Sequence, residues 1–136
     1  MLALAQRRWT IPAEAVHVGT LRREVERVAA EDGLSAEQLA DVRLAVSEAV
    51  SNAVRHGFPR GAVGTIEVTV LTGAAGVRVR VADDGIGIGQ RSEDPGSGFG
   101  LGLIGTLADS TTTRPTPGGG HTVEMLFCGG RAALAS

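Results

Sequence analysis

Glu48 and Asn52 are the two residues whose types and spacing favour chemistry. They lie four positions apart, and residues four apart on a helix share a face. A carboxylate can take a proton as a general base, and an amide oxygen is a ligand that Mg²⁺ accepts beside phosphate oxygens and water. Asn52 is also the only asparagine of the chain, at a mid-helix position that disfavours this residue. The pair predicts a base and a metal ligand that face one space.

Two glycine-rich segments follow that helix. Asp83-Asp84-Gly85-Ile86-Gly87 comes at the end of an expected strand, so the Asp83 carboxylate can accept a hydrogen bond from a ligand's amino group while the glycines permit close approach. Gly98-Phe99-Gly100-Leu101-Gly102 is expected to lead into a short helix, Leu101 to Ala108, whose N-terminal N–H groups would face phosphate. Together with the acid and the amide, the two segments indicate a nucleotide site.

Composition excludes several classes of protein. All 13 basic residues are arginines, so the chain has no Walker A lysine and no lysine base, and a phosphate site must use backbone amides, arginine or metal. The net charge of -2 and the 3% aromatic content give no footprint for nucleic acid. Cys128 is the only cysteine, which suits a reducing compartment. Without an 18-residue apolar run or a signal peptide, we expect a cytoplasmic protein with no membrane partner.

The elements that must position these residues follow from periodicity and turn signals. We expect the order β, α, α, β, β, α, β, β, with a capping box at Ser35 and Gln38 before the helix that carries Glu48. This order predicts an α/β two-layer sandwich, with a mostly antiparallel mixed sheet and helices on one face. By length the chain is a single domain, residues 1–136, with a core over about 8–127 and a tail at 129–136. The expected elements span residues 8–11, 13–32, 35–57, 65–71, 77–83, 101–108, 110–113 and 121–127.

The order and spacing of these motifs resemble a known family. Glu48 with Asn52, the Asp83 segment and the Gly98 segment look like the N, G1 and G2 boxes of the GHKL ATPases, and Gly118-Gly119-Gly120 resembles their closing glycine motif. Within that superfamily the chain is most similar to the RsbW and SpoIIAB type of anti-sigma factor and serine kinase. The resemblance covers about residues 8–127.

This resemblance implies a Bergerat ATP-binding fold with ATP and Mg²⁺ as cofactors. It assigns Asn52 to Mg²⁺, Glu48 to the catalytic base and Asp83 to the adenine amino group. It further implies that nucleotide contacts come from Gly85, Gly87, Gly98, Gly100, Leu101 and Gly102. The implied partners are a sigma factor and a STAS-domain anti-anti-sigma protein that is phosphorylated on serine or threonine, and the implied assembly is a homodimer.

Three further residues carry expectations. Arg55, three residues after Asn52, could reach a phosphate. Thr122 is the candidate for the adenine contact that relatives make with a threonine after the last glycines, although His121 stands directly after them here and strand alternation puts the two on opposite faces. Arg22 matches an exposed arginine with which relatives contact partners. Its plain interpretation is a solvated charge paired with Glu26.

Two alternatives stay open. A non-catalytic module could bind ATP and sequester a partner without phosphorylating it, since an acid such as Glu48 can persist for stability or metal binding. A histidine-kinase-type ATPase domain shares all three boxes, but His17 lacks the acidic residue that usually follows an acceptor histidine. A kinase assay with a candidate antagonist would separate the first alternative from the serine kinase.

Overall fold

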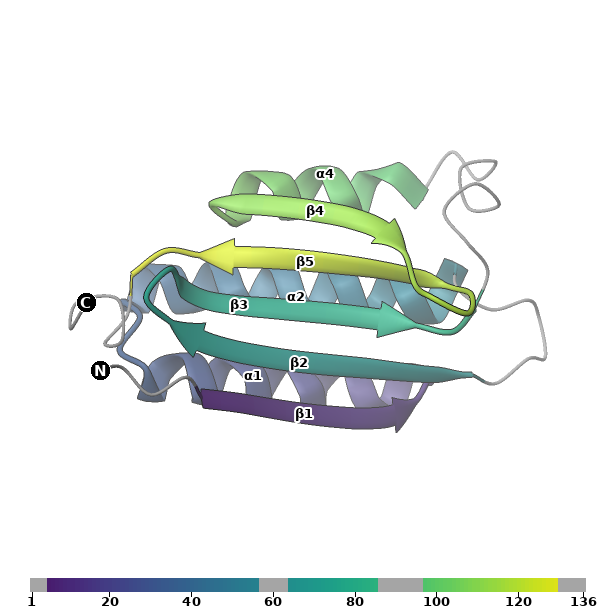
Figure 1. Cartoon of the computed structure of the whole chain (residues 1–136), viewed down its shortest axis with the longest axis horizontal. Coiled ribbons are helices and arrows are strands. Elements are labelled where there is room, and N and C mark those ends of the chain that lie inside the picture. Colours follow the sequence, from purple (N-terminus) through teal and green to yellow (C-terminus); the bar gives the residue numbers. More distant parts are fainter. Residues whose placement is uncertain (1–4, 57–63, 86–96, 130–136) are drawn as a thin grey trace.

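The structure, a computed structural model, describes residues 5–56, 64–85 and 97–129, with only the backbone of 56 and 97–101 (Figure 1). The elements follow the expected order, with a short 3-10 turn at Ala15–His17 before the first α-helix. They are β1 Ala5–Pro12, α1 Val18–Glu31, α2 Ala36–His56, β2 Thr65–Gly73, β3 Gly76–Asp83, α4 Ser97–Leu107, β4 Ser110–Pro115 and β5 His121–Phe127.

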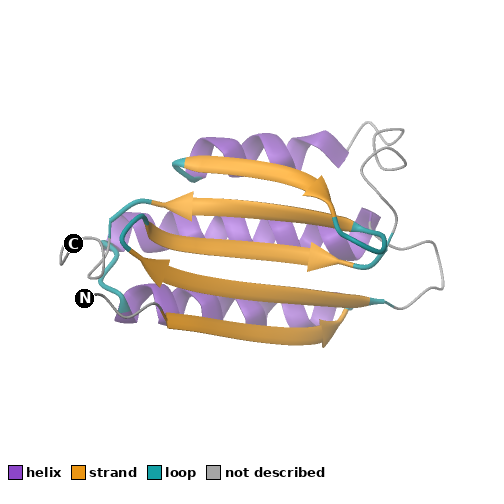
Figure 2. Ribbon diagram, in the orientation of Figure 1, coloured by secondary structure: helices purple, strands orange, loops and turns teal. Residues whose placement is uncertain are grey.

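The five strands form one sheet in the order β1-β2-β3-β5-β4. Every pairing between these strands is antiparallel, so the described sheet is antiparallel throughout rather than mixed. Figure 2 shows the described α-helices, α1, α2 and α4, in a layer behind the sheet, and none of them covers its other face. The two-layer α/β sandwich predicted from the sequence is confirmed.

The core lies between the sheet and the helix layer. In β3 the alternate residues Val77, Val79 and Val81 face the helices, because successive side chains of a strand point to opposite faces. From the helix side, α2 buries Val42, Val46 and Val50, which recur at the spacing of one helical face. This packing fixes α2 across the inner face of β3 and β5.

The start of α2 is fixed by the expected capping box. The Gln38 backbone N–H donates to Ser35 Oγ at 3.1 Å, and the Ser35 N–H donates to Gln38 Oε1 at 3.0 Å. These reciprocal bonds satisfy backbone donors that the first turn of a helix leaves without a partner. From this cap the helix runs to His56 and carries Glu48, Asn52 and Arg55 in its last three turns.

The start of α4 differs from the sequence-based prediction. The helix begins at Ser97 rather than Leu101, so Gly98 and Gly100 lie inside it instead of ahead of it. Glycine disfavours a helix interior by roughly 1 kcal/mol per residue, which is why the glycines indicated a loop. Packing of α4 against α2, with Ile104 fully buried, overrides that propensity.

No helix among the described residues is long and apolar enough to cross a membrane.

Candidate functional site

The last turns of α2 bring three polar side chains together. The Arg55 guanidinium donates a hydrogen bond to Asn52 Oδ1 at 3.2 Å, and the same nitrogen lies 4.0 Å from Glu48 Oε2. The spacings of three, four and seven residues place all three on one side of the helix. The acid and the amide that the sequence paired therefore do face one space, and a cation already lies between them.

Asn52 is buried yet incompletely bonded. Its residue exposure is 6%, and its Nδ2 is buried with no hydrogen-bond partner in the described part of the chain. The bond from Arg55 needs an acceptor, so it fixes Oδ1 as the atom that faces the guanidinium. A buried amide group without a partner costs free energy and calls for an explanation. A bound ligand beside the helix would supply the missing partner.

A metal ion could be held here only if a nucleotide and water supplied further ligands. Among the residues that the structure describes, no cluster of three or more His, Cys, Asp or Glu side chains could hold an ion. Asn52 offers one amide oxygen, a ligand type that suits Mg²⁺ when phosphate oxygens and water complete the shell. The donor set fits a metal that arrives with a nucleotide.

Asp83 ends β3 on the inner face of the sheet. It is 3% exposed, and its Oδ1 accepts a hydrogen bond from the Gly85 N–H at 3.0 Å. This Asx turn turns the chain away from the strand directly after the carboxylate. Asp84 has a different role, because its Oδ1 accepts a hydrogen bond from the Thr65 N–H at 2.8 Å. The second aspartate thus links two strand ends and stays out of the site.

A glycine turn closes over the backbone of Asp83. Gly120 has a φ of 94°, and a Cβ at this position would overlap the Asp83 carbonyl group. Only glycine combines that positive φ with so close an approach. The turn is held by the Thr116 N–H, which donates to the Gly120 carbonyl at 3.1 Å. The three-glycine motif therefore fixes the end of β3 that carries Asp83.

Thr122 and His121 lie on opposite faces of the sheet. Strand alternation puts Thr122 on the outer face of the sheet, where its hydroxyl lies 2.8 Å from that of Thr116. His121, which is 3% exposed, lies directly opposite Asp83 in the β3–β5 register and on the inner face. The threonine after the glycines is therefore directed away from the helix layer, and the neighbour of Asp83 is the histidine.

The remaining glycines of the two predicted glycine-rich segments differ in where they lie. Gly87 lies outside the described residues. The early start of α4 puts Gly98 and Gly100 into its first turn, where backbone N–H groups have no intrahelical partner. That position keeps them candidates for phosphate. Gly102 lies one turn further on and is exposed, with open space around a Cβ.

The expected pairing of Arg22 with Glu26 is not formed. Both Glu26 oxygens accept hydrogen bonds from Arg43, at 2.9 and 2.7 Å, and these bonds, with a smaller contribution from the charge of Arg22, lower the pKa of Glu26. Arg22 is half-buried, and its Nε has no hydrogen-bond partner in the described segments. Glu26 pairs with Arg43 rather than with Arg22 because the planar guanidinium of Arg43, on α2, makes two parallel hydrogen bonds to the carboxylate.

Sequence reasoning missed that Arg55 engages Asn52 and Glu48 directly. The signal was present in the spacing, because residues i, i+4 and i+7 share a helix face. The sequence predicts Arg55 only as a residue that reaches outward to phosphate.

Comparisons with known proteins agree with this architecture. Residues 11–127 match the family described as Histidine kinase-like ATPase domain. The serine-protein kinase RsbW of Listeria monocytogenes serotype 4a (strain HCC23) is 34% identical over 114 residues, which cover 73% of each chain. RsbW of Bacillus subtilis (strain 168) is 30% identical over 130 residues, 85% of this chain and 80% of that protein.

Two further similarities point the same way. The anti-sigma F factor of Thermoanaerobacter sp. (strain X514) is 30% identical over 115 residues, 76% of this chain and 80% of that protein. A histidine kinase domain from the blue-light activated kinase of Erythrobacter litoralis EL346 superimposes with a TM-score of 0.56 at 24% identity, over 85% of this chain and 60% of that one. With the buried Asp83, its glycine turn and the polar face of α2, these matches establish that the chain belongs to the histidine kinase-like ATPase domain family.

Proposed function

We propose that this protein is an ATP-dependent serine/threonine kinase of the GHKL type that acts as an anti-sigma factor. The observation that carries the proposal is the incomplete polar group on α2, in which the buried amide nitrogen of Asn52 lacks a partner among the described residues, beside Glu48 and Arg55. The similarity to RsbW kinases and to an anti-sigma F factor over most of the chain supports the same activity.

The nucleotide would bind between α2 and the end of β3. Asp83, buried and held by the glycine turn, would accept a hydrogen bond from the adenine amino group. The first turn of α4, with Gly98 and Gly100, would donate backbone N–H groups to the phosphates. Asn52 Oδ1 would take Mg²⁺, which when bound neutralises phosphate charge and orients the γ-phosphoryl group.

Glu48 is the proposed general base. Its side chain is 30% exposed, so a substrate hydroxyl can approach it from solvent. Glu48 would take the proton of a seryl or threonyl hydroxyl, whose oxygen forms a bond to the γ-phosphorus. The bond from that phosphorus to the bridging oxygen breaks, and ADP leaves with the electron pair.

Arg55 must move for this site to be loaded. Its guanidinium donates to the same Oδ1 that would ligate the metal, and two cations at one amide oxygen repel each other. The side chain is 57% exposed and its contact with Glu48 is long, so leaving costs little. Once released, the guanidinium can turn to the nucleotide phosphates, the role expected from the sequence.

The partners follow from the related proteins. We propose that the substrate is a STAS-domain anti-anti-sigma protein, that the captured protein is a sigma factor, and that the active form is a homodimer. Arg22 is the proposed contact residue, because Glu26 is engaged by Arg43 and leaves the Arg22 guanidinium without that pairing. Its half-buried stem on α1 limits the entropy lost when a partner binds.

The test is phosphotransfer from ATP to a purified STAS-domain protein encoded beside this one, followed by mass spectrometry of the acceptor. We expect one phosphoryl group on a serine or threonine of the acceptor, and release of the sigma factor by the unphosphorylated acceptor only. ATP binding and sigma-factor capture without any phosphotransfer would instead identify a sequestering module.

A further inference from the structure

The face of the sheet opposite the helices carries an excess of arginine. Alternation and register place Arg8, Arg78, Arg80 and Arg114 on this outer face, with Glu67 and Glu124 as the acidic residues of the same strands. No described helix covers it (Figure 1). Four cations against two anions leave the strands of this face positively charged, although the whole chain is slightly acidic.

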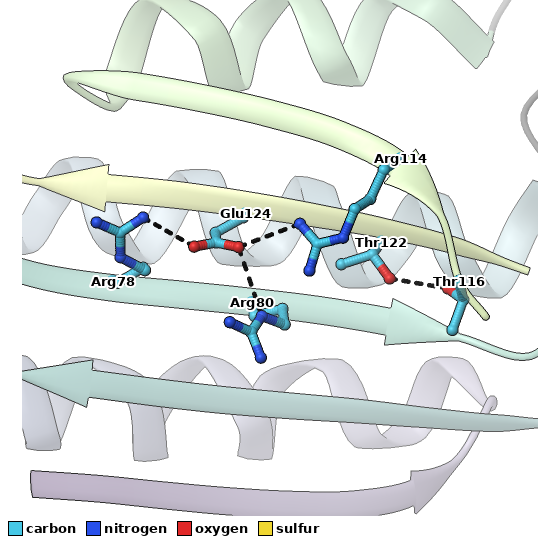
Figure 3. Close-up of polar contacts among 6 residues, drawn as sticks. All are labelled: Arg78, Arg80, Arg114, Thr116, Thr122 and Glu124. Atoms are coloured by element: carbon cyan, nitrogen blue, oxygen red, sulfur yellow. Dashed lines mark hydrogen bonds and ion pairs between the residues drawn. The ribbon is translucent and has the colours of Figure 1, made fainter.

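Three of these arginines converge on Glu124. Figure 3 shows Arg78, Arg80 and Arg114, from β3 and β4, directed at one carboxylate on β5. The nearest nitrogen–oxygen distances are 2.8, 3.5 and 3.3 Å respectively. Burial alone raises the pKa of Glu124, but hydrogen bonds from Arg78 and Arg114 and the charge of Arg80 outweigh it and lower the pKa. Glu124 thus stays ionised and pins three guanidinium groups.

One carboxylate cannot satisfy this arginine cluster of Arg78, Arg80 and Arg114. Each guanidinium has five N–H donors, whereas a carboxylate offers about four lone-pair sites, so most of these donors cannot be satisfied by Glu124. The three arginine side chains are 36 to 48% exposed, whereas Glu124 is 12% exposed. The cluster is therefore accessible, carries a net charge of about +2 and is already oriented, which lowers the entropy cost of binding an anion.

Aliphatic side chains adjoin the cluster. In the register, Leu71 and Leu126 lie on either side of Arg78, and both are half-buried on the same outer face. Arginine is enriched at protein interfaces, and its position next to apolar surface suits a protein partner better than a free anion. At the other end of the face, a groove of about 200 Å³ includes Glu67 and Asp84 in its lining, and these carboxylates would repel acidic groups. Acidic groups of a ligand are thus confined to the arginine cluster.

We propose that this outer face docks an acidic segment of a partner protein. The carboxylates of the segment bind Arg78, Arg80 and Arg114, and its aliphatic side chains cover Leu71 and Leu126. A second copy of this chain is a poorer occupant, because apposing two such faces brings together arginines that exceed the glutamates on both sides. The surface lies on the far side of the sheet from Glu48 and Asn52, so the proposal stands independently of the nucleotide site.

The test uses the full chain labelled with ¹⁵N and a short fluorescent peptide in which glutamates alternate with leucines and serines. Anisotropy measures affinity, and amide shifts map the site. We expect shifts on β3, β4 and β5 and an affinity that falls with added salt. Arg78→Gln and Arg114→Gln should each weaken binding roughly two- to fivefold, the range of one exposed ion pair. Glu124→Gln should strengthen binding by a similar factor, because it releases the three guanidinium groups.

Arg27→Gln is the matched control. Arg27 is also an exposed arginine held by two acids, Glu24 and Glu31, but it lies on α1 in the helix layer. This variant should bind the peptide as the wild type does. Equal losses in Arg27→Gln and Arg114→Gln, or shifts confined to the helices, would overturn the proposal.

Two further outcomes would also overturn it. Inorganic phosphate that reproduces the same shifts at the same affinity would reduce the face to a simple anion site. A dimer in sedimentation velocity that dissociates in Arg114→Gln would assign the face to a second copy of the chain.

Discussion

Two acid–arginine groups lie on opposite sides of this fold, and they are satisfied to different degrees. On the outer face, Glu124 is held by three arginines at 2.8 to 3.5 Å. On α2, Glu48 has one arginine at 4.0 Å, and the neighbouring Asn52 keeps an amide nitrogen without a partner in the described chain. A carboxylate held by three arginines, such as Glu124, orients the side chains around it. Glu48 has one long arginine contact and lies beside a buried amide nitrogen without a partner, so this group is suited to a ligand that supplies the missing contacts.

The largest effect should come from the α2 group. Glu48→Gln preserves size and hydrogen-bonding capacity but removes the base, so phosphotransfer should fall by about 10²-fold or more. ATP affinity, measured by calorimetry, should stay near the wild-type value. A variant that transfers phosphate at the normal rate would show that Glu48 is not the base. Glu48 would then not differ from Glu124 in having a catalytic role.

The glycine turn supplies the next effect. Gly120→Ala forces a positive φ on alanine and pushes a Cβ into the Asp83 carbonyl, so the free energy of unfolding should fall by roughly 2 kcal/mol or more. Gly118→Ala is the control, because its φ is also positive, at 89°, but open space surrounds it. Thermal denaturation should place Gly118→Ala between the wild type and Gly120→Ala. Equal stability of both variants would mean that contact with Asp83 plays no part.

Asp83→Asn tests the far end of the same site. Loss of the charged acceptor should weaken nucleotide binding by about 1 to 3 kcal/mol, the cost of impairing a buried hydrogen bond. Titration with ATP and with GTP separates a loss of adenine recognition from a general loss of nucleotide binding, since only adenine presents an amino group at that position. Unchanged ATP affinity would exclude Asp83 from adenine recognition.

The smallest effect concerns Glu124 and pH. The arginine contacts lower its pKa in the folded state, so it contributes stability that is present above its unfolded pKa and is lost as pH falls through the folded value. Urea unfolding should show that the wild type loses more stability between neutral and acidic pH than Glu124→Gln. Identical pH profiles would mean that the arginine cluster contributes nothing to folding.

The sequence predicted the fold well because its signals are local and repeated. Alternating valines in β3, the capping box at Ser35 and the two-residue turn between β2 and β3 each favour one structure. The start of α4 was missed because the packing that overrides its glycines involves α2, which is distant in sequence.

The site was only partly predictable for a related reason. The shared face of Glu48 and Asn52 follows from spacing alone, and strand alternation warned that Thr122 and His121 point apart. The preference of Glu26 for Arg43 over Arg22 depends on how α1 meets α2, which no local pattern encodes. The convergence of three arginines on Glu124 likewise depends on the pairing of β3 with β5, two strands that are far apart in the sequence.

The most direct test of the account is the Mg²⁺ dependence of ATP binding in the wild type and in Asn52→Ala, measured by calorimetry with and without the metal. We predict that Mg²⁺ strengthens binding to the wild type and that Asn52→Ala loses this enhancement while still folding. An equal response to Mg²⁺ in both proteins would contradict the assignment of the α2 group as the site that the nucleotide and its metal complete.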